Sequence, residues 1–175
     1  MAILRLQLLT YLALSLVAGI CVLTLDSCSP NGDSGQQPFL GNFAMGQTVR
    51  VGPLTYTVLE AKWRPSLSND PQARLPKNRY VIIRLSVTNK GGEETAFPQL
   101  TLQSSIGQEY AEVIEGVSEV PSWLAPLARS LKPAQSESGN VVFDVPLGAY
   151  KLKVPEPSDV DTPKFALIDI PIQLE

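Results

Sequence analysis

Apolar side chains recur at every second position in much of the chain after residue 39, and this alternation constrains the fold more than any other feature. In the segment YVIIRLSVTN, residues 80–89, one face carries Val81, Ile83, Leu85 and Val87, while Arg84 falls on the opposite face. A period of two indicates a half-buried β-strand, because successive strand side chains point to opposite faces of a sheet. The segment is therefore predicted to be a strand with an apolar inner face.

Other segments alternate in the same way, and turn-forming residues separate them. The alternating segments are residues 54–60, 140–145, 150–154 and 167–174; the turn signals are Gly52-Pro53, Asn89 to Gly92, Gly107, Pro133 and Pro146 to Gly148. Many short strands with regular turns are typical of a sandwich or barrel. Pro171 lacks a backbone donor, so its segment is predicted to lie at a sheet edge.

Two segments depart from the strand pattern. Residues 109–119, EYAEVIEGVSE, are the one helix-like stretch, in which Glu112, Glu115 and Glu119 could share a face, although Gly116 and Val117 weaken it. Residues 64–77 contain three prolines and are predicted to form a long loop. Fifteen prolines and the lack of a long amphipathic period argue against an α/β fold.

The order of these segments resembles the DUF4352 domain, an immunoglobulin-like sandwich of bacterial exported proteins and lipoproteins that is similar to the MPT63-like secreted antigens. The resemblance covers residues 46–154, and the segments that carry it are MGQTVRVGPLTYTVLEAKW, YVIIRLSVTNKGGEETAF, LTLQSSIGQEY and LKPAQSESGNVVFDVP. It implies an all-β, immunoglobulin-like antiparallel β-sandwich. It supplies no catalytic motif, because the family has no common activity. Ala134 follows Pro133 where the family usually has glycine.

The N-terminus has the composition of an export signal. Residues 6–25 carry no charge, which matches the roughly 20 apolar residues needed to span a bilayer, and Arg5 precedes them. Their few polar residues are scattered around a helix rather than gathered on one face. Residues 28–38 are small and polar and are predicted to be a flexible tether.

Leu25-Asp26-Ser27-Cys28 resembles the bacterial lipobox, although Asp26 is unusual at its position. The resemblance implies cleavage before Cys28, a diacylglycerol thioether on its sulfur and an acylated amine. The predicted organisation is a lipoprotein signal peptide over 1–27, a tether over 28–38 and a β-sandwich domain over 39–175. An uncleaved membrane anchor and simple release are the alternatives, and all three place the domain outside the cytoplasm. In a cell with an outer membrane, Ser29 is similar to the signal for sorting there, facing the periplasm.

Composition narrows the chemistry of the folded part. The chain has no histidine, so a Ser-His-Asp triad is excluded and the commonest metal ligand is absent. With Cys21 in the signal peptide and Cys28 lipidated, no thiol remains for a disulfide, and stability must come from packing. The net charge of −3 argues against a nucleic-acid partner. We expect a monomeric domain without a metal or cofactor.

The acidic residues leave two further functions open, calcium binding and carboxylate-dependent hydrolysis. Glu156, Asp159 and Asp161 could offer oxygen ligands to calcium from the loop 156–161, although their spacing matches no EF-hand. A carboxylate-dependent hydrolase would need two acids facing one cleft. Glu93-Glu94 follow Gly91-Gly92 and are predicted to be a solvated hairpin tip instead.

Non-catalytic binding, or an accessory role in the cell envelope, is therefore the predicted function, and a structural spacer is its alternative. The predicted partners are the membrane, through a lipid on Cys28, and an envelope protein. The candidate contact segment is 121–130, with Trp123 as the anchor beside Leu124, Leu127 and Arg129, since tryptophan is enriched at binding hot spots. The competing interpretation is that Trp123, like Trp63, closes the end of the core.

Overall fold

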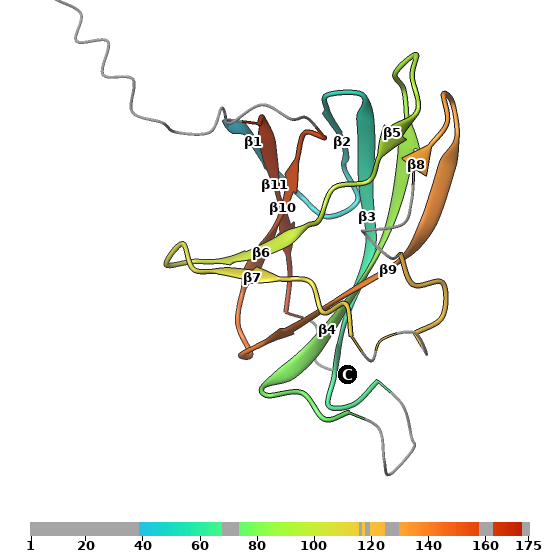
Figure 1. Ribbon diagram of the computed structural model, residues 1–175. Helices are drawn as coiled ribbons and strands as arrows, with labels where there is room; N and C mark the ends of the chain where they lie inside the picture. The colour runs from blue at the N-terminus through green and yellow to red at the C-terminus, as the bar shows by residue number, and fades with distance from the viewer. Residues whose placement is uncertain are drawn as a thin grey trace, which may run out of the picture. The chain divides into compact units, whose positions relative to one another are not determined.

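The computed structural model describes residues 39–67, 74–115, 117, 120–124, 130–157 and 163–172. Every regular element in these ranges is a β-strand (Figure 1). The strands are β1 (Phe39–Phe43), β2 (Thr48–Val51), β3 (Leu54–Arg64), β4 (Arg79–Asn89), β5 (Thr95–Ala96), β6 (Thr101–Ser104), β7 (Glu109–Ala111), β8 (Ser130–Leu131), β9 (Ser136–Val145), β10 (Tyr150–Pro155) and β11 (Phe165–Ile170).

Two sheets pack face to face and enclose the core between them. One sheet has the order β1-β11-β10-β6-β7 and the other β2-β3-β4-β9, while β5 and β8 form a short ladder. The described strand pairs are antiparallel except for β1, which runs parallel to β11. The predicted all-β sandwich is confirmed, with one parallel pair that alternation could not reveal.

The predicted face of β4 is confirmed. Val81, Ile83 and Leu85 are fully buried, whereas Arg84 is exposed. β4 lies between β3 and β9, so its inner side chains have apolar neighbours on both sides. The main core joins these residues to inner faces of the other sheet. Its other largest fully buried members are Leu54, Tyr56, Leu100, Leu102, Leu131, Phe143, Leu152 and Ile168.

A β-bulge in β3 explains why the buried positions of this long strand change from even to odd residue numbers along its length. Tyr56 and Val58 are buried at even positions, and Ala61 and Trp63 are buried at odd positions. The register with β4 shifts between Val58 and Glu60, which leaves Leu59 half exposed. A bulge adds one residue to a strand, so it restores the inward direction of the side chains that follow.

The prediction that Pro171 lies in an edge strand is wrong. β11 ends at Ile170, one residue before Pro171, and it pairs with both β1 and β10. Pro171 therefore ends an interior strand, where its missing donor breaks no ladder bond. The sequence pattern missed this because β1, from the other end of the domain, supplies the second neighbour.

The helix-like stretch 109–119 forms no helix in the residues that the structure describes. β7 covers the first three residues, and the described residues of 112–124, here named the strap, cross to the outer face of the β9 sheet. Val117, Val120 and Trp123 pack there against Tyr80 and Val142 in a second, smaller apolar cluster. The outer face of the β9 sheet is partly apolar here. By packing on it, the strap buries apolar side chains of its own and of the sheet, which a solvated helix over the same residues would leave exposed.

The strap also protects the free edge of β9. The N–H groups of Val113 and Leu124 donate to the carbonyl oxygens of Val142 and Asn140, at 2.8 and 2.9 Å. The Asn140 N–H donates to the Ser122 carbonyl at 2.8 Å. A Cβ at Gly139 would collide with that carbonyl, so the glycine permits the close approach. Covering an edge strand removes a site for unwanted strand pairing.

The predicted loop and N-terminal segments are only partly within the described ranges. β3 ends at Arg64, and residues 65–67 and 74–78 form no strand, as predicted. The Asp144 carboxylate accepts the N–H groups of Lys77 and Asn78 at 2.7 and 2.8 Å, which fixes the return into β4. Among the described residues, none belongs to an apolar helix long enough to cross a bilayer. The predicted signal peptide, Cys28 and tether lie outside the described residues.

Candidate functional site

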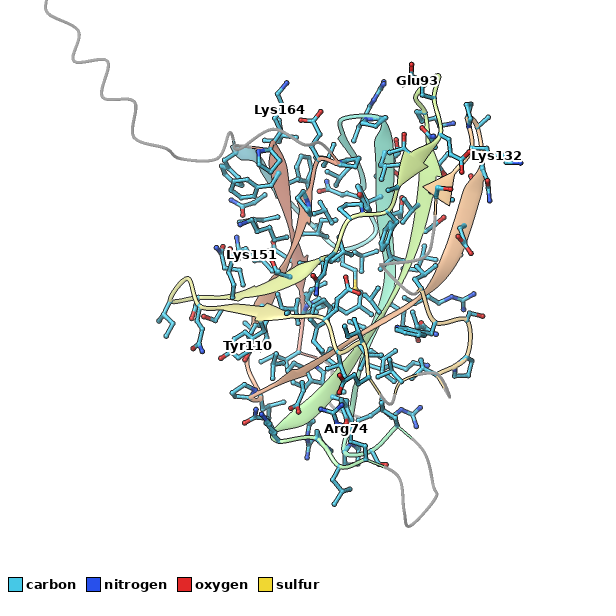
Figure 2. All side chains as sticks on the ribbon, viewed as in Figure 1. Arg74, Glu93, Tyr110, Lys132, Lys151 and Lys164 are labelled. Carbon is cyan, nitrogen blue, oxygen red and sulfur yellow. The ribbon has the colours of Figure 1, made fainter. Side chains whose placement is uncertain are left out.

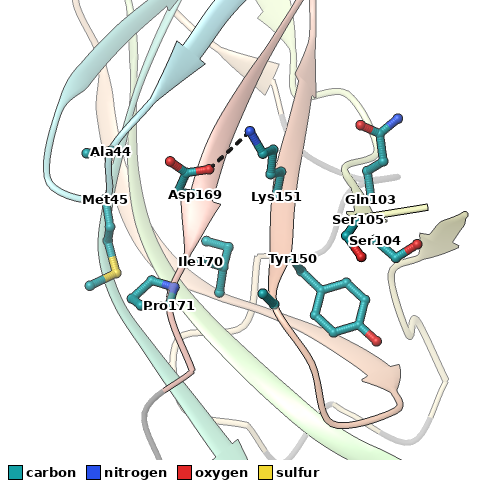
Figure 3. Close-up of a pocket in the computed structure, with 11 residues that line it drawn as sticks. Ala44, Met45, Gln103, Ser104, Ser105, Tyr150, Lys151, Asp169, Ile170 and Pro171 are labelled. Atoms are coloured by element: carbon teal, nitrogen blue, oxygen red, sulfur yellow. Dashed lines mark ion pairs between the residues drawn. The ribbon is translucent and has the colours of Figure 1, made fainter. Parts of the chain in front are cut away.

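An apolar groove lies at one end of the five-stranded sheet (Figure 3). Its volume is about 540 Å³. Two adjacent rows of cross-strand partners line it. Ser104, Tyr150 and Ile170 form one row across β6, β10 and β11, and Gln103, Lys151 and Asp169 form the next.

Because side chains alternate along a strand, one row faces the core and the other faces solvent. Tyr150 and Ile170 turn inward and are buried, whereas Lys151 and Asp169 turn outward. Lys151 Nζ lies 3.4 Å from Asp169 Oδ1 and donates to Asn42 Oδ1 at 2.7 Å. This ion pair is partly exposed, so it orients the rim and contributes little to stability.

The turn after β1 and the end of β11 complete one wall, and the end of β6 completes the other. Figure 3 shows Met45 and Pro171 on one side, with Ser105 on the opposite side. The Tyr150 hydroxyl donates to the Pro146 carbonyl at 2.8 Å, which holds the ring in place. Burial raises the pKa of Tyr150, and the nearby Tyr110 raises it further. Tyr150 is therefore a neutral, fixed wall at physiological pH.

Exposed apolar side chains lie next to the groove in the chain. Ile106 follows Ser105, and Ile172 follows Pro171; their exposed fractions are 84% and 45%. Leu147, in the turn before β10, is 53% exposed. An apolar hollow with apolar residues beside it and a few polar groups at its rim has the character of a binding site.

The described lining of the groove lacks the pair of acids that carboxylate-dependent glycoside hydrolysis uses. Asp169 is the one carboxylate among the described lining residues, and it is paired with Lys151. Two acids facing one cleft are the minimum for carboxylate-dependent glycoside hydrolysis. The groove therefore offers recognition chemistry, with an apolar floor and a polar rim.

Glu112 is the charged residue buried most deeply among those described, but it lies in the core rather than in the groove. Its Oε1 accepts the Leu100 N–H at 2.6 Å, and its Oε2 is buried without a partner. Burial raises its pKa to about 7, and the Leu100 hydrogen bond acts in the opposite direction. A smaller hollow of about 230 Å³ is lined by Arg74 and by residues 112–115, so Glu112 itself borders it.

A third hollow, of about 900 Å³, lies beside the predicted hairpin tip. Glu93 and Glu94 line it together with Glu156 and the prolines and glycines of the adjoining turns. Glu94 accepts a hydrogen bond from the Ser130 hydroxyl. In the described ranges, no three Asp, Glu, Cys or His side chains gather as a metal site would require. Asp159 and Asp161 lie outside those ranges, so calcium binding by loop 156–161 stays a prediction.

The predicted contact segment 121–130 is divided by the fold. Leu124 is buried in the main core, and Trp123 is half-buried against the second cluster. The indole N–H of Trp123 is buried and lacks a hydrogen-bond partner. Leu127 and Arg129 lie outside the described residues. These contacts favour a packing role for Leu124, and binding through Trp123 stays a prediction. Trp63 packs in the main core, as the competing interpretation expected.

Sequence reasoning missed the groove because its residues come from four distant segments. Residues 44–45, 103–105, 149–151 and 169–171 meet only when β1, β6, β10 and β11 share a sheet. One local signal existed for Glu112. It directly precedes Val113 and Ile114, and an acid inside an apolar run indicates either a solvated bend or a buried carboxyl.

Two facing sheets that enclose one apolar core define the class of this protein as a small β-sandwich domain. Within that class, the chain belongs to the family described as Domain of unknown function (DUF4352), which it matches over residues 43–163. This confirms the resemblance inferred from the strand motifs. A search of curated proteins found no match.

Solved structures agree on the fold. The YjhA protein of Bacillus subtilis is 16% identical with a TM-score of 0.58, and the match covers 74% of this chain and 99% of that one. MPT63, a secreted protein of Mycobacterium tuberculosis, is 13% identical with a TM-score of 0.53, covering 74% and 96%. A functionally unknown protein of Listeria monocytogenes is 14% identical with a TM-score of 0.53, covering 73% and 82%. Identities this low support the shared sandwich alone.

Proposed function

We propose that this protein is a membrane-tethered extracytoplasmic lipoprotein whose sandwich domain binds an envelope partner without catalysis. The observation that carries the binding role is the groove lined by Met45, Tyr150 and Ile170, with exposed Ile106 and Ile172 beside its walls. Apolar surface of this kind is normally buried against a partner. A pure spacer would not need such a groove.

The lipobox-like segment Leu25 to Cys28 supports the tether. The similarity to a secreted mycobacterial protein supports an extracytoplasmic location. Metabolic labelling with a palmitate analogue, followed by mass spectrometry of the N-terminal peptide, should find Cys28 acylated. An unmodified and uncut N-terminus would refute the tether.

Photocrosslinking in the producing cell tests the groove. A photoreactive residue replaces Ser105, which lines the groove and is exposed, and a control probe replaces Leu75, which is 75% exposed in the loop before β4. We expect a discrete crosslinked product from position 105 only. Ala149→Arg, at an exposed lining position, should block the groove and abolish the product without lowering thermal stability.

The spacer alternative makes the opposite prediction for the same experiment. A spacer would give no product at position 105, or a product that Ala149→Arg leaves unchanged. Either result would remove the groove from the proposal, and the lipid analysis at Cys28 would be unaffected.

A further inference from the structure

The sheet end at which β1 begins carries an apolar patch, here named the β1 patch and defined as Phe39, Leu40 and the partly buried Phe165. Phe39 and Leu40 are 50% and 42% exposed, although they open the first strand of the domain. The Phe39 and Phe165 rings lie 5.4 Å apart between centroids in a tilted arrangement. Lys164, directly before Phe165, is exposed.

The patch and the groove lie at opposite ends of the same strands. β1 is parallel to β11, with Phe39 paired to Phe165 at the start of both strands. The groove begins where β11 ends, at the pair of Ile170 with Tyr150. A six-residue strand separates the two ends by about 17 Å, at roughly 3.4 Å per residue. Figure 2 shows Lys164 and Lys151 at different levels along this sheet.

The position of the patch in the chain points to its occupant. Phe39 follows Cys28 by eleven residues, which can span at most about 40 Å even when fully extended. A lipid on Cys28 would therefore hold the patch near a bilayer at an effective concentration on the order of millimolar. At that concentration, a patch too small to bind membranes alone would still be occupied.

The charges around the patch favour apolar contact over electrostatic attraction. Lys153 Nζ lies 4.8 Å from the centroid of the Phe165 ring, but it is paired with Glu109 at 2.8 Å. Glu156 donates its N–H to the Lys164 carbonyl, so a carboxylate residue also lies beside that lysine. Phenylalanine and leucine side chains enter the headgroup region of bilayers, and salt does not screen their burial.

We infer that the β1 patch rests on the surface of the bilayer to which the chain is tethered, so that the groove opens away from the membrane. This inference rests on the tether proposed above and adds an orientation for the domain. It gives the partner-binding groove a direction, toward proteins or ligands beyond the membrane surface.

A lipid photocrosslinking experiment with the full, processed chain tests the orientation. The probe p-benzoylphenylalanine replaces Leu40 in one variant and Ile172 in a matched control. Ile172 is 45% exposed, close to the 42% of Leu40, but lies at the groove end. Each variant is reconstituted in phosphatidylcholine vesicles, with and without phosphatidylglycerol, illuminated, and analysed by mass spectrometry for lipid adducts.

We expect a lipid adduct at position 40, with a yield several-fold above that at position 172 and little dependence on salt or on phosphatidylglycerol. Adding Phe39→Ser to the position 40 variant should lower the yield several-fold. Equal yields, a higher yield at position 172, or a protein adduct in place of lipid would overturn the orientation.

Vesicle sedimentation distinguishes the two proposals. Protein that sediments with the vesicles but gives no adduct at position 40 overturns the orientation and leaves the tether intact. Protein that stays in the supernatant overturns the tether, and the orientation with it.

Discussion

The Leu100 N–H donates a 2.6 Å hydrogen bond to Glu112 Oε1 inside the core. Glu112 is 5% exposed, and its other carboxyl oxygen is buried without a partner. Burial raises the pKa of Tyr56 on β3, and the charge of Glu112 raises it further; the Tyr56 hydroxyl is also buried without a partner. The hydrogen bond holds the first residue of the strap against the end of the core.

The burial of Glu112 predicts that the stability of the domain falls as pH rises through mildly acidic values. Burial raises the pKa of Glu112 from the ordinary 4.5 to about 7, so the folded chain keeps a proton that the unfolded chain releases between these values. The stability that the protonated Glu112 contributes is fully present below pH 4.5, decreases between pH 4.5 and 7, and is lost above pH 7. The total loss is up to about 3 kcal/mol, at about 1.4 kcal/mol per pH unit.

Glu112→Gln should remove that dependence. The free energy of unfolding from urea titrations should match the wild type near pH 4.5 and exceed it increasingly up to pH 7. Glu115→Gln removes one acidic charge at an exposed neighbouring position and serves as the control. If the wild type and Glu112→Gln keep a constant difference across this range, Glu112 does not titrate in the window.

Ala134 should be replaceable by glycine with a gain in stability. Its φ of 62° lies in the left-handed region, and its N–H donates to the Asn89 carbonyl at 3.0 Å, so the turn holds it there. That conformation costs an alanine about 1–2 kcal/mol, partly offset by the greater unfolded freedom of glycine.

Ala134→Gly should therefore raise the free energy of unfolding by about 0.5–1 kcal/mol in urea titrations. Ala149→Gly is the control, because Ala149 is also exposed but does not have a positive φ. The control should be neutral or slightly destabilising. Equal gains from both substitutions would show that backbone strain at Ala134 is not the cause.

The register of β4 predicts opposite effects at adjacent positions. Ile83 is fully buried, so Ile83→Ala should lower the free energy of unfolding by about 2–5 kcal/mol through lost transfer energy and a residual cavity. Arg84→Ala, on the exposed face, should cost under about 1 kcal/mol. Chemical denaturation measures both, and similar losses would mean that the faces are exchanged.

Trp123 distinguishes a structural strap from a binding segment. Trp123 packs with Tyr80 and Val142, so Trp123→Ala should lower the free energy of unfolding by about 2–3 kcal/mol if packing is its role. A binding anchor would leave thermal stability nearly intact and lose partner capture in a crosslinking pull-down. Thermal denaturation and the pull-down on the same variant decide between these roles.

The strands could be predicted from the chain because their side chains alternate locally. The inward positions of β4, such as Ile83, and of β10, such as Leu152, follow from a period of two that needs no knowledge of neighbours. The turns followed from glycine, proline and asparagine chemistry, and the family followed from the order of both. Composition alone also excluded a Ser-His-Asp triad, because the chain has no histidine.

Tertiary structure alone decided what the alternation left open. Pro171 ends an interior strand because β1 pairs with β11 from the far end of the domain, and no local pattern encodes that pairing. Glu112 is buried because the strap crosses to β9, and that burial raises its pKa, while the hydrogen bond from Leu100, twelve positions away, acts in the opposite direction. The groove joins residues of four segments through cross-strand rows. Local sequence sets which face of a strand is apolar, but long-range contacts determine which strands meet, and both the groove and the environment of Glu112 depend on those contacts.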